Sequence, residues 1–159
     1  MTGFSSRVEA VSISGIREVF EAAGDDAINL GLGQPDFPTP DHAREAAVEA
    51  IRAGEVDAYT SNKGTLELRE AIAEKHERDN DLDVDPGDII ATSGGSEALH
   101  IALEAHVDSA GHRPASERTQ SESSGQEVIF PDPGFVSYDA LTHLAGGTPK
   151  PVGLREDLT

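Results

Sequence analysis

Residues 88–103 read DIIATSGGSEALHIAL, and this stretch decides how the chain folds. A short apolar run at 89–91 precedes Gly94 and Gly95, and an apolar stripe with helical spacing follows them. This order predicts a strand, a glycine turn and a helix. Glycines let backbone N–H groups approach an anion, and the first helical turn leaves its N–H groups unpaired at the positive end of the dipole. The stretch therefore predicts a phosphate-binding turn, in which Ser96 either caps the helix or donates to a phosphate oxygen.

Two well-known nucleotide motifs do not fit the chain. A P-loop needs Gly-Lys-Ser/Thr at the end of its glycine turn, and that sequence does not follow Gly95. A dinucleotide fingerprint is suggested by Gly31 and Gly33, but Asp36 stands where the third glycine belongs and Pro35 precedes it. An unrelated nucleotide-binding α/β module is therefore disfavoured, while a capped glycine turn without a ligand stays open for this stretch alone.

The composition is strongly acidic. The chain has 159 residues, enough for one domain or part of a larger one, with 30 Asp plus Glu against 12 Lys plus Arg and a net charge of −18. This charge would repel nucleic acid and anionic membranes, so neither is expected as a partner. Adaptation to a salt-rich cytoplasm explains the excess, because salt screens the self-repulsion, and general solubility is the alternative.

Several classes of site and location are excluded by residue usage. The absence of cysteine removes disulfides, thiol catalysis and cysteine-based metal sites. The six histidines form no HExxH or i,i+4 pair, so no metal site is predicted. No apolar run reaches membrane-spanning length, and the N-terminus lacks a basic region followed by an apolar core. The prediction is a cytoplasmic protein.

Helical and extended segments alternate along the chain, which predicts an α/β protein. Helices are expected at 13–24, 39–53, 65–78, from the glycines to about 107, and at 136–145; strands are expected at 89–91, 128–130 and 150–154. Residues 108–127 contain almost no large apolar side chain and read as a polar surface insertion.

Two of the helices carry specific signals. For the helix at 39–53, Thr39 is expected as N-cap, Pro40 as first residue and Gly54 as the stop. Its stripe is mostly alanine, which suits close packing. The helix at 65–78 is expected to turn three residues inward, namely Leu68, Ala71 and Ile72.

Five blocks in this order resemble the N-terminal part of the class I/II pyridoxal-phosphate (PLP)-dependent aminotransferases of fold type I. They are SRVEAVSISGIREVFE, INLGLGQPDFPTP, AYTSNKGTLELREAIA, IIATSGGSEAL and VIFPDPGFVSYDALTHLAGG. The resemblance implies a mixed, mostly parallel sheet flanked by helices, of which this chain supplies the first part. Residues 1–38 would form an N-terminal helix and arm, and residues 39–159 the first portion of the large PLP-binding domain.

The resemblance also implies a cofactor site. Gly95, Ser96 and Glu97 match the phosphate-cradle positions, where backbone N–H groups and the Ser96 hydroxyl would donate. The Glu97 carboxylate would point away from the phosphate, since like charges repel. Phe135 matches the aromatic residue that stacks on the cofactor ring. Without the family match, Phe135 would be read as a core residue after a tight turn.

Two further positions match residues that act elsewhere in the family's site. Tyr59 matches the tyrosine that reaches across a homodimer interface to the partner's cofactor phosphate. Gly33 matches the glycine that lies beside the substrate carboxylate. Taken alone, they read as a loop tyrosine and a turn glycine.

The family's reaction moves an amino group from an amino acid to a 2-oxo acid by a ping-pong route. Its Schiff-base lysine, the acid on the pyridine nitrogen and the arginine for the substrate carboxylate lie downstream of the matching blocks. Lys63, Lys75, Lys150 and Arg155 match none of these, so no catalytic residue is assigned. The alternative is a non-enzymatic fragment, or one piece of a split enzyme, that binds phosphate or a partner chain.

Overall fold

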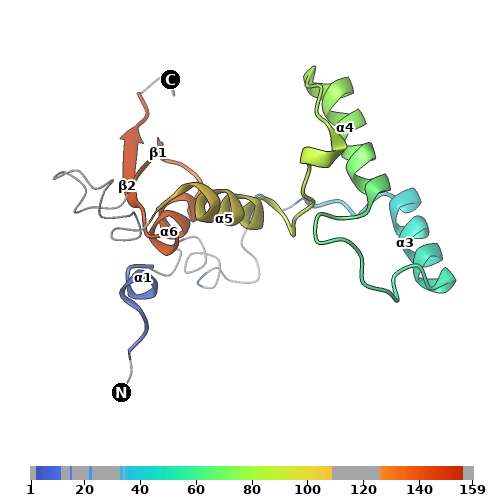
Figure 1. Ribbon diagram of the computed structural model, residues 1–159, viewed down its shortest axis with the longest axis horizontal. Coiled ribbons are helices and arrows are strands. Elements are labelled where there is room, and N and C mark those ends of the chain that lie inside the picture. Colours follow the sequence, from blue (N-terminus) through green and yellow to red (C-terminus); the bar gives the residue numbers. More distant parts are fainter. Residues whose placement is uncertain are drawn as a thin grey trace. The chain divides into compact units, whose positions relative to one another are not determined.

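The computed structural model describes residues 3–11, 15, 22, 33, 35–108 and 126–155. The chain divides into two compact units, one formed by residues 1–29 with 93–159 and the other by residues 30–92 (Figure 1). The helix expected at 13–24 lies outside the described residues, apart from residues 15 and 22. Each unit is described by itself.

The unit of residues 30–92 contains helix α3 (Asp41–Ala53), as predicted. The prediction for its N-terminus was wrong by one position, because Pro40 is the N-cap and not the first helical residue. Pro40 has an extended ψ of 140°, and its carbonyl accepts the N–H groups of Ala43 and Arg44. Gly54 ends the helix as expected, since its φ of 73° favours glycine.

The apolar side of α3 is not covered within the described part of its unit. None of its residues is buried, and Ile51 is 61% exposed. Among the described residues, the alanine stripe is exposed except at the half-buried Ala50, so the expected close packing is not seen within this unit.

Helix α4 (Leu66–Asn80) begins at Thr65, whose Oγ1 accepts the Leu68 N–H at 3.3 Å. The predicted inward face was partly wrong. Leu68 and Ala71 are exposed, whereas the half-buried positions are Arg69, Ile72, Ala73 and His76. The reason is that α4 packs on the short 3₁₀ helix η1 (Pro86–Asp88), where the Arg69 guanidinium donates to the Pro86 carbonyl at 2.6 Å.

The strand expected at 89–91 is absent from the described structure. The backbone there is extended, with Ile89 at φ −94° and ψ 136°, but no described strand pairs with it. The Ala91 N–H instead donates to the Lys63 carbonyl at 2.9 Å, and the Lys63 ammonium donates to the Gly87 carbonyl at 2.9 Å. An extended segment becomes a strand only when a neighbouring strand completes its hydrogen bonds.

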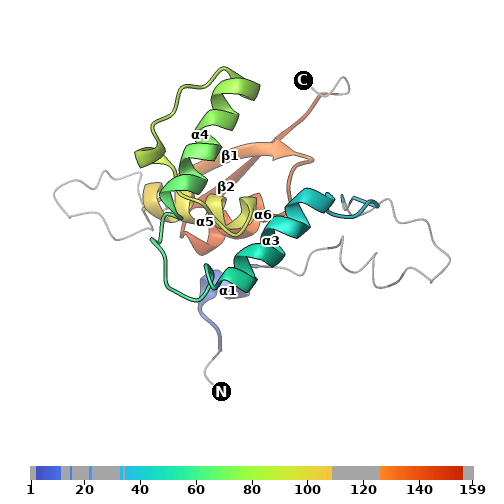
Figure 2. The same ribbon diagram turned by 90° about the vertical axis from the view of Figure 1, so that its right-hand side faces the viewer.

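The other unit contains a β–α–β arrangement (Figure 2). Strands β1 (Glu127–Asp132) and β2 (Thr148–Gly153) pair in parallel, from Glu127 opposite Thr148 to Asp132 opposite Gly153. Helix α6 (Ser137–Leu144) connects them and packs against helix α5 (Gly95–His106). These four elements confirm the predicted segments within one or two residues at most ends.

The core of this unit is small. Thr142 is fully buried and donates its hydroxyl to the Tyr138 carbonyl at 2.7 Å, and Ala145 is 4% exposed. The short helix α1 (Ser6–Glu9), which the sequence did not predict, contacts α6 through Arg7, whose guanidinium donates to the Leu144 carbonyl at 3.0 Å.

Strand β1 is buried on one side only. Val128 and Phe130 are half-buried, whereas Ile129 is 73% exposed, so the expectation of a buried strand holds for alternate residues. In the described residues of both units, Ile89 and Ala145 are the apolar side chains that become buried.

Most of the predicted insertion at 108–127 lies outside the described residues. The residues at its two ends are close together, since the Asp108 N–H donates to the Gln126 side-chain oxygen at 2.7 Å.

Candidate functional site

The predicted phosphate-binding turn lies at the N-terminus of α5. Gly94 is the N-cap and has φ 87° and ψ 177°, a conformation that essentially only glycine adopts. Ser96 is the second residue of the helix, so the option that it caps the helix was wrong. Its hydroxyl as a phosphate donor stays a prediction.

The space in front of this turn suits an anion. A Cβ built on Gly95 would meet no heavy atom within 4 Å, and residues 93–97 are all exposed. The first N–H groups of a helix have no intrahelical acceptor and lie at the positive end of the dipole. The turn is therefore accessible to an anion, and phosphate binding there stays a prediction.

The two side chains that follow Gly95 behave differently. The Glu97 carboxylate accepts a hydrogen bond from the Ser93 backbone N–H, four residues earlier. The Ser96 side chain makes no such bond to another described residue. The Glu97 side chain is thus engaged within the turn.

Phe135 lies in the same unit, after β1 and a tight turn. Its ring is 48% exposed and meets the Tyr138 ring edge to face, with centroids 5.7 Å apart. Tyr138 also contacts Phe130, at 5.8 Å between centroids. Gly134 is required before Phe135, because a Cβ there would lie 2.3 Å from the Pro131 carbonyl oxygen. A partly exposed ring held in this way could stack on a planar cofactor.

Gly33 and Tyr59 lie in the other unit, that of residues 30–92. Tyr59 belongs to the loop between α3 and α4 and is fully exposed, at 108%. Gly33 is exposed, and an added Cβ would meet no atom within 4 Å. Since each unit is described by itself, Gly95, Ser96, Glu97 and Phe135 belong to one unit, and Gly33 and Tyr59 are not placed with them.

Sequence reasoning missed Ser93, Gly134 and Tyr138, which shape the surroundings of the predicted site. Signals for all three were present. Tyr138 follows Phe135 by three residues, the spacing of neighbours on a helix, and Gly134 follows a proline. Glu97 lies four residues after Ser93, close to the spacing of a capping box.

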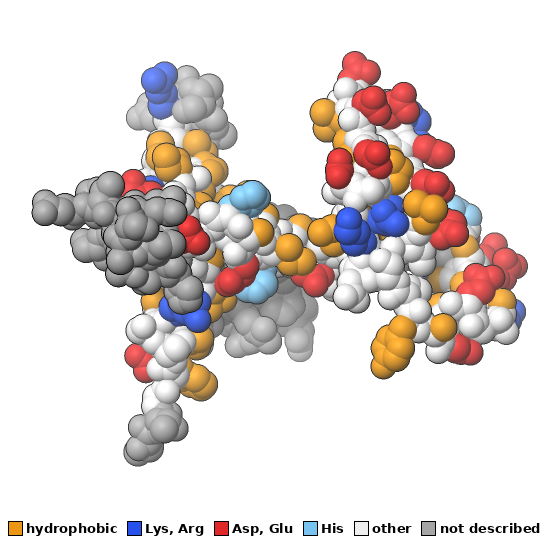
Figure 3. Space-filling view, in the orientation of Figure 1, with side chains coloured by type: hydrophobic (Ala, Val, Ile, Leu, Met, Phe, Trp, Pro, Cys, Tyr) orange, Lys and Arg blue, Asp and Glu red, His pale blue; other side chains and the backbone are white. Residues whose placement is uncertain are grey.

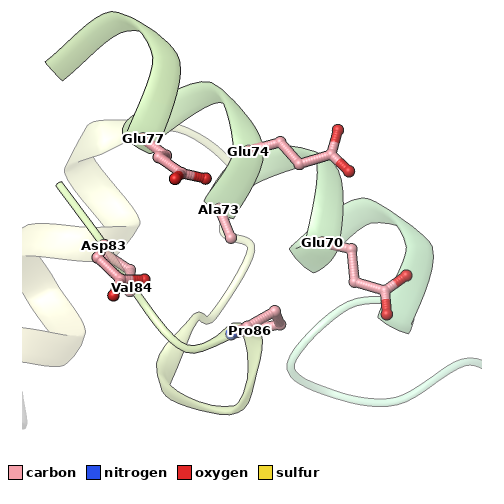
Figure 4. A pocket seen from close by; sticks show the side chains of 7 residues that line it. All are labelled: Glu70, Ala73, Glu74, Glu77, Asp83, Val84 and Pro86. Atoms are coloured by element: carbon pink, nitrogen blue, oxygen red, sulfur yellow. The ribbon is translucent and has the colours of Figure 1, made fainter. Parts of the chain in front are cut away.

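A separate cavity of about 440 Å³ lies beside α4 and is acidic (Figure 4). It is lined by Glu70, Ala73, Glu74, Glu77, Asp83, Val84 and Pro86. Asp and Glu side chains cover much of the visible surface of this unit (Figure 3). Among the described residues, no group of three or more His, Asp or Glu is arranged to hold a metal ion.

None of the described helices combines the length and the apolar character that crossing a membrane requires.

Comparison with known proteins identifies the family. The sequence profile of the family described as "Aminotransferase class I and II" matches residues 25–158. A probable aspartate aminotransferase of Methanocaldococcus jannaschii is 42% identical over 153 residues, covering 96% of this chain and 36% of that protein. A probable aspartate aminotransferase of Streptomyces griseus is 39% identical and is covered to 65%. The chain thus spans about a third of the length of the first relative.

Comparison with solved structures leads to the same family. The aspartate aminotransferase of Thermus thermophilus with maleate is 36% identical, with a TM-score of 0.80 over 99% of this chain and 38% of that one. A structure described as Pyrococcus protein A1 is 40% identical, with a TM-score of 0.81 over 96% and 36%. The predicted fold type is confirmed, and aminotransferases of this class and fold depend on PLP, as predicted. The chain therefore belongs to the class I and II aminotransferases and corresponds to their N-terminal part.

Proposed function

We propose that this chain supplies the phosphate-binding turn and the ring-stacking aromatic residue of a PLP-dependent aminotransferase. The enzyme would transfer an amino group between an amino acid and a 2-oxo acid. The observation that carries the proposal is the exposed turn at the N-terminus of α5, with Gly94 in a glycine-only conformation and open space at Gly95. The half-exposed Phe135 ring in the same unit supports it.

Each proposed residue has a distinct task. The backbone N–H groups of Gly95, Ser96 and Glu97, together with the Ser96 hydroxyl, bind the phosphate. Phe135 offers a flat apolar surface to the pyridine ring. Bound PLP supplies the electron sink through which an amino group can be exchanged. The chain's own residues anchor and orient the cofactor, and none of its three lysines is proposed as catalytic.

The remaining assignments belong to the assembled enzyme. Tyr59, fully exposed in its loop, would reach the cofactor phosphate of the partner in a homodimer, and Gly33 would lie beside the substrate carboxylate. Residues 1–38 would form an arm and residues 39–159 part of the large domain. Because several relatives are described as aspartate aminotransferases, aspartate is the first amino donor to test.

The acidic surface supports a cytoplasmic protein adapted to high salt. The net charge is −18, and many carboxylates are spread over the visible surface of the unit that carries α3 and α4 (Figure 3). At high ionic strength such charges repel one another over only a few ångströms.

A chimera tests the function of this chain's residues. The chain would replace the matching N-terminal part of the Methanocaldococcus jannaschii relative, so that the rest of that protein is available to cover the apolar side chains that this chain exposes. We expect the chimera to retain PLP and to transfer the amino group of aspartate to 2-oxoglutarate. Ser96→Ala and Phe135→Ala should each weaken PLP retention in equilibrium dialysis, whereas Ser5→Ala, at a hydroxyl that makes no cap hydrogen bond, should not.

Unchanged PLP affinity in both the Ser96 and the Phe135 variants would remove the site assignment. A folded chimera that never retains PLP would instead favour a non-enzymatic fragment that binds a partner chain. The intact mass of the native polypeptide, detected through peptides from residues 65–107, would show which form its cells make.

A further inference from the structure

The entry to α5 contains a side-chain hydrogen bond to which the proposed phosphate site assigns no role. The Glu97 carboxylate accepts the N–H of Ser93. Glu97 is the third residue of the helix, and Ser93 stands immediately before the N-cap, Gly94. In a capping box, the third residue reaches back to the N-cap N–H. Here the same side chain reaches one residue further.

This hydrogen bond spans the most flexible part of the turn. Gly94 and Gly95 lie between its two ends, and glycine loses more conformational freedom on ordering than any other residue. Gly94 has no side chain with which to cap the helix. A Cβ on either glycine would meet no atom within 4 Å, so surrounding side chains do not hold the turn by packing. The Glu97–Ser93 hydrogen bond therefore ties the first turn of α5 to the residue before the N-cap, across both glycines.

We propose that Glu97 is a positioning residue, whose carboxylate holds the glycine turn in its phosphate-binding conformation before the cofactor arrives. Ordering the turn in advance lowers the entropy lost on binding. In this hydrogen bond a carboxylate oxygen of Glu97 accepts the backbone N–H of Ser93, so the negative charge of Glu97 lies beside Ser93. The inference rests on the proposed function, since it assigns a role to a side chain of that site.

Two substitutions separate the acceptor from the charge. Glu97→Ala removes both the hydrogen-bond acceptor and the negative charge. Glu97→Gln keeps an acceptor oxygen for the Ser93 N–H and removes the charge, which repels a phosphate dianion. If the hydrogen bond matters, the alanine variant binds PLP more weakly by about 3- to 30-fold, the range of helix-cap losses. The glutamine variant binds PLP at least as tightly as the unmodified protein.

The experiment uses the chimera with the Methanocaldococcus jannaschii relative, carrying this chain with or without the substitution, and has two readouts besides activity. Equilibrium dialysis gives the PLP dissociation constant. Hydrogen exchange of the Ser93 amide, followed without cofactor, reports the hydrogen bond itself. Glu104→Ala is the matched control, because it removes one negative charge from the same helix at its other end. It should change neither readout.

We expect the Glu97→Gln variant to bind PLP as tightly as the unmodified protein or more tightly, and the Glu97→Ala variant to bind it most weakly. Protection of the Ser93 amide should be lost in the alanine variant alone. An alanine variant with unchanged PLP affinity would overturn the inference, and so would a glutamine variant as weak as the alanine one, while the unmodified protein still binds PLP. Absence of PLP binding by a folded chimera that carries the unmodified chain would overturn the proposed function itself, and the inference with it.

Discussion

Replacing Gly94 by alanine should open the first turn of α5, even though the added Cβ would meet no atom within 4 Å. The obstacle is the backbone. At φ 87° and ψ 177° an alanine is held in a sparsely populated region, at a cost of about 1–3 kcal/mol. This free-energy cost raises the equilibrium constant for opening the first turn of α5 about 5- to 150-fold.

The neighbouring Gly95 should respond in the opposite direction. It is the first residue of α5, its φ lies outside the left-handed region, and its Cβ would also stand in open space. Alanine at a compatible position stabilises by about 0.4–1 kcal/mol, because the unfolded chain has fewer states to lose. Gly95→Ala should therefore leave the helix end unchanged or lower its opening constant by up to about fivefold.

Amide hydrogen exchange in α5 measures both changes. The N–H groups of Ala98 and Leu99, which lie in the first turns of α5, should exchange faster in Gly94→Ala and at an equal or slower rate in Gly95→Ala. The reasoning would be refuted if the two variants changed exchange in the same direction, or if Gly94→Ala left it unaltered. In either case, the glycine-only conformation of the turn would not be what orders the helix end.

Three further changes test other parts of the structure. Gly134→Ala should destabilise the unit of residues 1–29 and 93–159 by about 1–3 kcal/mol in denaturant melts, because its Cβ would lie 2.3 Å from the Pro131 carbonyl oxygen. Thr65→Ala should lower the stability of α4 by about 1 kcal/mol, through loss of the N-cap hydrogen bond, as measured by hydrogen exchange. Hydrogen bonds from Arg78 and then Lys75 lower the pKa of Asp79 to about 2. The contribution of the ionised Asp79 carboxylate to folding stability is therefore complete above its ordinary pKa of 3.8 and is lost as the pH falls through about 2. An NMR titration of the Asp79 carboxyl group would show this pKa.

Each of these has its own control. Gly153→Ala, where nothing lies within 4 Å of the new Cβ, should be tolerated, and an equal loss there would deny the steric argument. Thr65→Ser keeps the hydroxyl acceptor and should retain most of the stability. Arg78→Ala should raise the Asp79 pKa toward 3.8, and an unchanged titration would contradict the assigned cause.

Local signals in the sequence were enough for most helix boundaries. Gly54 ended α3 as predicted, and α4 began within one residue of the predicted start at Thr65, because such ends depend on the dihedral angles and hydrogen bonds of neighbouring residues. The ordered blocks also identified the family, since a profile and several relatives match the same region. The error at Pro40 was a shift of one residue, within the usual uncertainty of helix ends.

Helix faces and strand pairing could not be predicted in the same way. The face that α4 buries depends on η1, and the apolar pattern alone favoured Leu68 and Ala71. Residues 89–91 have the composition of a strand, but the described structure gives them no strand neighbour, and the Lys63 carbonyl takes the Ala91 N–H instead. Packing depends on partners that lie far away in the sequence, and periodicity does not name them.

The candidate site also has features that local sequence determines and features that depend on tertiary packing. The sequence by itself determined the glycine turn, the helix after it and the position of Phe135, because these follow from local backbone preference and from ordered motifs. Only the tertiary structure decided that β1 pairs in parallel with β2, that Tyr138 supports the Phe135 ring, and that the Glu97 carboxylate accepts the Ser93 N–H. These arrangements depend on how side chains and strands meet in space, which residue types and spacing leave open.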